Sequence, residues 1–160
     1  MRGLTRRRTT VDRAVREAAQ YMPDNGGLDE LISRLSAARG RPLALVHHEL
    51  APDGPSGVWI DLPEKDYLVV ATDAPPSREA AIICHELGHI VLGHAGPSLT
   101  SGVDMLAPDI SPHVTARFLN RHSYEDQQER DAEAFGTMLA AEHARRRSRH
   151  STSGLSDRLR

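Results

Sequence analysis

Residues 80–92 read Ala-Ala-Ile-Ile-Cys-His-Glu-Leu-Gly-His-Ile-Val-Leu and form the most apolar stretch of the chain. Within it, His85 and His89 are four residues apart, so on an α-helix both imidazoles project from one face. Two imidazoles at this spacing suit a tetrahedral Zn²⁺, and Glu86 is placed to reach a metal-bound water as a general base. The stretch therefore predicts a buried helix that carries a metal site.

A catalytic zinc site normally has three protein ligands, so the two histidines need a further partner. His94 follows His89 by five residues, which rotates it away from the histidine face. We expect His94 to be a polar residue at the helix end, where the helix dipole favours an imidazolium. The longer HExxHxxGxxH pattern does not apply, because positions 92 and 95 hold Leu and Ala. The third ligand is therefore expected on another segment.

Residues 126–147 are predicted to form a long helix with one face of carboxylates and small side chains. This face holds Glu129, Ala132, Glu133, Gly136 and Ala140. Small residues let two helix backbones approach closely, as a Glu requires to reach a metal held by another helix. Glu129 and Glu133 are both candidates on this face. Asp131 points elsewhere, and Glu125 shares the face but precedes the helix.

The remaining pattern predicts an α+β fold, in which a small antiparallel sheet packs on helices. The domain is expected over residues 10–147, between a flexible N-terminus at 1–9 and a disordered tail at 148–160. Helices are expected at 11–22, 28–40, 77–93, 112–120 and 126–147, and strands at 43–46, 57–62 and 67–71. The last two strands are expected to form a hairpin with a four-residue loop.

The composition sets limits on partners and compartment. The 160 residues carry a formal net charge of −2 and a single Cys, so the sequence predicts no nucleic-acid partner and no intrachain disulfide. No apolar run is long enough to cross a membrane, and no signal peptide is predicted, so a cytoplasmic location is expected. Cys84 is expected to be a small buried apolar side chain. The arginines at 6–8 and 145–147 lack interleaved aromatic residues and are expected to be solvated.

Two motifs together resemble the ImmA/IrrE family of zinc metallopeptidases, which are compact gluzincins. They are HELGHIVLGH at residues 85–94 and ERDAEAFG at residues 129–136. The resemblance implies Zn²⁺ as the cofactor and Glu129 as the third ligand. It also implies that Glu133 is a carboxylate that hydrogen-bonds a ligand histidine and so fixes its tautomer. Gly136 departs from the family pattern, in which Ala is usual.

The resemblance further implies that the chain cleaves a partner protein, often a transcriptional repressor with a helix-turn-helix domain. Glu86 would then take a proton from the attacking water and pass it to the leaving amine. Tyr124, just before the helix expected at 126–147, is a candidate to stabilise the oxyanion of the tetrahedral intermediate. The alternative is a non-enzymatic, zinc-containing regulator that acts by binding its partner. The intact Glu86 argues against that alternative, because a pure binding module needs no base.

Overall fold

The computed structural model describes residues 2–50, 55–94 and 126–157. In chain order the elements are α1 (Arg2–Ala19), α2 (Leu28–Arg39), β1 (Leu43–His48), β2 (Gly57–Asp61), β3 (Asp66–Ala71), α3 (Pro76–Val91) and α5 (Asp126–Asp157). The predicted α+β class is therefore confirmed. The predicted helix at 112–120 lies outside the described residues.

The three strands form one sheet in the order β1-β3-β2. The predicted hairpin is confirmed: β2 pairs antiparallel with β3, with Trp59 opposite Leu68. The first strand differs from the prediction of an antiparallel sheet, because β1 pairs with β3 in parallel and the sheet is mixed. Alternation of apolar residues marks a strand but does not encode the direction of its neighbour. β1 ends and β2 begins at the same end of the sheet, because His48 lies opposite Ala71 and Gly57 lies opposite Val70. β3 returns between them and therefore runs parallel to β1.

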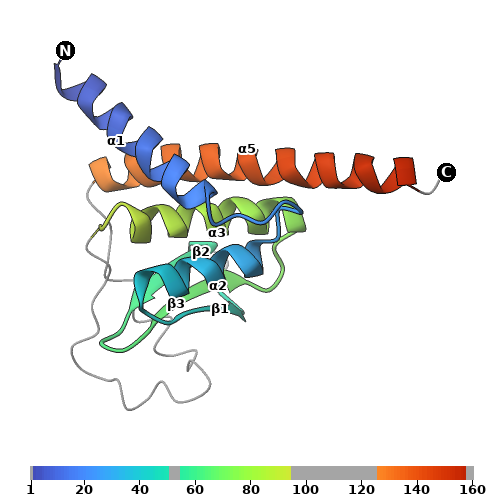
Figure 1. Cartoon of the computed structure of the whole chain (residues 1–160). Helices are drawn as coiled ribbons and strands as arrows, with labels where there is room; N and C mark the ends of the chain where they lie inside the picture. The colour runs from blue at the N-terminus through green and yellow to red at the C-terminus, as the bar shows by residue number, and fades with distance from the viewer. Residues whose placement is uncertain (1, 51–54, 95–125, 158–160) are drawn as a thin grey trace.

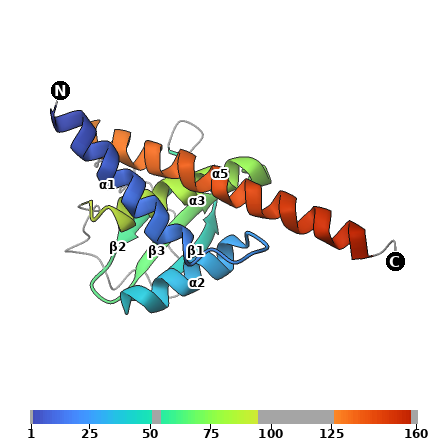
Figure 2. The same cartoon turned by 45° about the horizontal axis from the view of Figure 1, so that its top comes forward.

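Helix α3 is the central element of the fold. Figure 1 shows it between the sheet and α5, with α1 crossing α5, and Figure 2 shows the same order from above. On one face of the sheet, Trp59, Leu68 and Val70 join the main core with residues of each described helix. The alternate residues of the strands form a smaller buried cluster on the other face, made of Val58, Ile60, Leu62 and Val69. The helix that carries His85, Glu86 and His89 is therefore supported by the main core.

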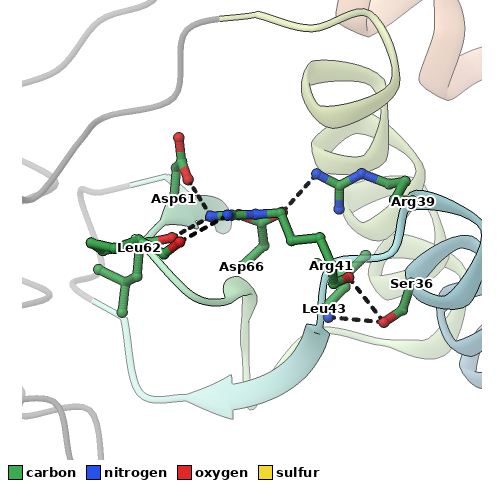
Figure 3. Close-up of polar contacts among 8 residues, drawn as sticks. Ser36, Arg39, Arg41, Leu43, Asp61, Leu62 and Asp66 are labelled. Carbon is green, nitrogen blue, oxygen red and sulfur yellow. Dashed lines mark hydrogen bonds and ion pairs between the residues drawn. The ribbon is translucent and has the colours of Figure 1, made fainter.

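A buried carboxylate joins α2 to the hairpin (Figure 3). Asp66 has no exposed surface, and its Oδ2 lies 2.7 Å from a guanidinium nitrogen of Arg39. Arg41 lies 3.0 Å from the Asp66 Oδ1 and 2.6 Å from the Asp61 Oδ1. The two arginines flank Gly40 at the end of α2: Arg39 is the last helical residue and Arg41 follows the glycine. Gly40 has a left-handed φ of 62° and turns the chain toward β1. The network therefore fixes the start of the sheet against the end of a helix.

Both ends of the chain are more helical than predicted. α1 begins at Arg2, where residues 1–9 were expected to be flexible, and α5 continues to Asp157, through most of the tail expected to be disordered. These segments lack an apolar face, which is why the pattern does not reveal them. The N-terminal segment is nevertheless rich in Arg, a good helix former. Both segments extend a helix that packing has already nucleated. Both views show the end of α5 extending away from the other elements (Figures 1 and 2). Within the described residues, no helix combines the length and the apolar character needed to cross a membrane.

Candidate metal centre

Helix α3 brings the two histidines together, as their spacing predicts. The Nε2 atoms of His85 and His89 lie 3.2 Å apart, and the rings are edge-on with centroids 4.9 Å apart. His89 has no exposed surface, whereas the His85 side chain is 23% exposed. The pair therefore lies where the helix passes from the core to the surface.

Close packing of α5 against α3 brings Glu129 to this pair. A β-carbon built on Gly136 would lie only 2.8 Å from the Cα of His85, and one built on Gly88 would lie 3.1 Å from the Cα of Ala132. Any side chain larger than that of glycine at positions 136 and 88 would hold the two helix backbones apart. The predicted face of small residues is thus the face that meets α3. Glycine at 136, where the resembling family usually has Ala, fits this close contact.

The Glu129 carboxylate reaches both histidines. Its Oε2 lies 3.4 Å from the His85 Nε2, and its Oε1 lies 3.5 Å from the His89 Nε2. One donor atom from each of the three residues lies within 4.8 Å of the others, so the cluster offers three converging metal ligands. Two imidazoles and one carboxylate are the ligand set of one class of catalytic zinc sites. Glu129 is 45% exposed, so solvent reaches the cluster from the α5 side.

Glu86 follows His85 in α3, and its side chain reaches the backbone of the sheet. Only 6% of Glu86 is exposed, and its Oε2 accepts a 2.9 Å hydrogen bond from the backbone N–H of Trp59 in β2. Burial raises the pKa of Glu86 to about 8, against the hydrogen bond from Trp59, which lowers it, and with a further increase from the charge of Glu129. A bound cation would favour the carboxylate form and oppose the effect of burial.

His89 is held in the neutral form that a metal requires. Burial, together with the neighbouring His85 and His94, lowers the pKa of His89 to about 3. Burial also lowers the pKa of His94, against the charge of Asp131, which raises it. A neutral imidazole has the lone pair that coordinates a metal, so no proton has to be displaced from His89 near neutral pH.

Each histidine also has a partner on its outer nitrogen. The Glu133 Oε2 lies 3.4 Å from the His85 Nδ1, where the resemblance implies a carboxylate partner. The His94 Nδ1 lies 2.9 Å from the His89 Nδ1, a contact that the sequence reasoning missed. Counting positions along a continuous helix places His94 on the wrong side. The signal that was available is Gly93, a residue that commonly ends a helix and reverses the chain.

The other candidates fall into three groups. Asp131 does not join the ligand cluster, and its Oδ1 accepts a 2.8 Å hydrogen bond from Gln127 on its own helix. Cys84 has no exposed surface, and burial raises the pKa of its thiol to about 12, as expected for a core residue. Tyr124 and Glu125 lie outside the described residues.

Of the basic clusters, the one at 145–147 lies within α5. Arg146 donates to the carbonyl oxygens of Met22 and Ala19 and pairs with Glu142, so it ties α5 to the end of α1. The side chains at 6–8 lie outside the description.

Comparison with known proteins finds no matching family model, no matching curated protein and no matching solved structure.

Proposed function

We propose that the protein is a zinc-dependent metallopeptidase. The observation that carries the proposal is the convergence of His85, His89 and Glu129, from two helices, beside the buried carboxylate of Glu86. The three converging residues would hold the zinc ion. A zinc ion bound there supplies a Lewis acid that polarises a carbonyl group and lowers the pKa of a water molecule.

The protein's own base in this proposal is Glu86. The N–H of Trp59 holds its Oε2, which leaves Oε1 to take a proton from the attacking water and return it to the leaving amine. Because α3 carries both Glu86 and the two histidines, the base and the ligands share one rigid element. That arrangement keeps the proton-transfer distance fixed while a substrate enters and leaves.

An extended peptide is the substrate that the surrounding backbone suits. Among the described strands, β2 is an edge strand. The Trp59 N–H points outward from that edge to Glu86 and does not pair with β3. A peptide that added to the free edge of β2 would gain backbone hydrogen bonds and lie next to the base. Following the resemblance, we propose a cytoplasmic helix-turn-helix repressor as the protein substrate.

The test incubates the parent and Glu86→Gln with a candidate helix-turn-helix repressor and follows its cleavage by mass spectrometry. Gln keeps the oxygen that accepts the Trp59 N–H but cannot take a proton, so the rate should fall by about 10²–10⁴-fold. Glu79→Gln, in the first turn of the same helix and bonded to His47, is the matched control and should cleave like the parent. Equal cleavage by Glu86→Gln and the parent would contradict the proposal. No cleavage by either, with tight zinc-dependent binding of the repressor, would favour a non-enzymatic regulator.

A further inference from the structure

Helix α3 ends in a chain reversal that returns the backbone onto the metal centre. Gly93 has a left-handed φ of 68°. Its N–H donates to the Ile90 carbonyl at 3.2 Å, and the N–H of His94 donates to the His89 carbonyl at 3.0 Å. This pair of bonds is the Schellman ending of a helix, which brings the residue after the glycine back to the residue five positions earlier. Residue 94 is thereby placed beside a candidate zinc ligand.

The side chains follow the backbone. The His94 Nδ1 lies 2.9 Å from the His89 Nδ1, and the two rings are edge-on with centroids 5.1 Å apart. The other ring nitrogen of His89, Nε2, faces His85 and Glu129. A contact between two ring nitrogens at this distance requires that one donates and the other accepts. If Nε2 of His89 is the metal ligand, Nδ1 carries the hydrogen, and the Nδ1 of His94 is the acceptor.

We propose that His94 is a positioning residue, which accepts the Nδ1–H of His89 and holds that imidazole in the tautomer that ligates zinc through Nε2. The inference rests on the metal site proposed above. His94 is not itself a ligand, because its near nitrogen contacts the outer nitrogen of His89. It does for His89 what Glu133 does for His85, with the difference that a neutral ring replaces a carboxylate. The two ligand histidines are thus oriented by different elements, one by the end of α3 and the other by α5.

Side-chain variants separate this role from a purely structural one. His94→Asn places an amide oxygen near the position of the Nδ1 and keeps an acceptor, whereas His94→Leu has a similar size and no acceptor. Zinc affinity is measured by competition with a chromogenic chelator, and the thermal stability of the metal-free proteins is measured in parallel. We expect His94→Leu to weaken zinc binding by about 10–100-fold and His94→Asn to retain most of the affinity. A residue that only fills space would give the two variants affinities that follow their stabilities.

Gly93→Ala tests whether the helix ending positions His94, and Gly40→Ala is its matched control at another helix ending. Gly40 ends α2 with a φ of 62° and the same two hydrogen bonds, from Gly40 to Ala37 and from Arg41 to Ser36. Among the described residues, neither Gly40 nor Gly93 has a neighbour within 4 Å of an added β-carbon, so the strain that Ala introduces at both positions comes from the left-handed φ. Gly93→Ala should lower zinc affinity because it displaces His94, whereas Gly40→Ala should lower the melting temperature and leave zinc affinity unchanged.

The outcomes distinguish the inference from the proposed function beneath it. If the parent binds zinc and His94→Leu binds it equally well, His94 has no positioning role and the metal site stands. If the two glycine variants change zinc affinity alike, the helix ending of α3 has no special part in the site. If the parent binds no zinc at this cluster, the proposed function fails and the inference fails with it.

Discussion

Replacing Glu86 by Gln is expected to remove a pH-dependent destabilisation from the metal-free protein. Burial, opposed by the Trp59 hydrogen bond and reinforced by Glu129, raises the pKa of Glu86 from 4.5 to about 8. Between these two values the folded protein keeps a proton that the unfolded chain releases. The contribution of this proton to stability is therefore fully present below pH 4.5 and is lost as the pH rises through 8.

The size of the effect follows from the width of this window. Each pH unit inside it changes the free energy of unfolding by about 1.4 kcal/mol, with flattening as the pH approaches the folded pKa. From about pH 6.5 to about pH 8, the parent should lose about 1.6 kcal/mol relative to Glu86→Gln, once the flattening near the folded pKa is included. His89, whose pKa is lowered to about 3 mainly by burial, is present in both proteins, so its contribution largely cancels in the difference.

The assay is urea unfolding of both proteins in the presence of a chelator, at several pH values across this range. Gln keeps an oxygen for the Trp59 N–H, so the variant should fold and should show the weaker pH dependence. A difference between the two proteins that stays constant from about pH 6.5 to about pH 8 would refute the reasoning. It would show that the buried carboxyl already ionises near its ordinary pKa in the folded protein.

Glu129→Gln should weaken zinc binding, measured by chelator competition, far more than Glu133→Gln or Asp131→Asn, because only Glu129 lies within reach of both Nε2 atoms; a larger loss for Glu133→Gln would reverse the ligand assignment. Gly136→Val should lower both the melting temperature and zinc affinity, because even its β-carbon would lie 2.8 Å from the α3 backbone, and unchanged affinity would show that the two helices need not be so close. Asp66→Asn should lower the free energy of unfolding, measured by urea denaturation, by about 3 kcal/mol, because it leaves Arg39 and Arg41 without their buried anionic partner. A loss well under about 1 kcal/mol would show that the network is not stabilising.

The residues of the candidate site that share an element were predictable from the sequence. His85, Glu86 and His89 follow from spacing on one helix, since a helix fixes the direction of residues one and four apart. The small-residue face of the second ligand-bearing helix narrows the third ligand to Glu129 or Glu133, and only the resemblance selects Glu129. Gly136 and Gly88 confirm that the close approach exists.

Three features of the structure do not follow from the sequence pattern: the contact of His94 with His89, the parallel pairing of β1, and the helical ends of α1 and α5. The contact of His94 with His89 arises from the reversal at Gly93, after which positions on an extended helix no longer apply. The parallel pairing of β1 has a different origin, because the second strand of the hairpin, β3, lies between β1 and β2. The helical ends of α1 and α5 escaped prediction for another reason. No apolar face marks them, and they extend helices that packing has already formed.

The measurement that tests the central claim most directly is the zinc content of the purified parent and of His85→Ala, determined by metal analysis. The parent should hold one zinc ion per chain, and His85→Ala should lose it, because the variant removes one of the three converging donors. His47→Ala is the matched control, since His47 is an exposed histidine that contacts Glu79 outside the cluster, and it should keep its zinc. Zinc retained by His85→Ala at the level of the parent, or no zinc in the parent after purification and reconstitution, would contradict the account.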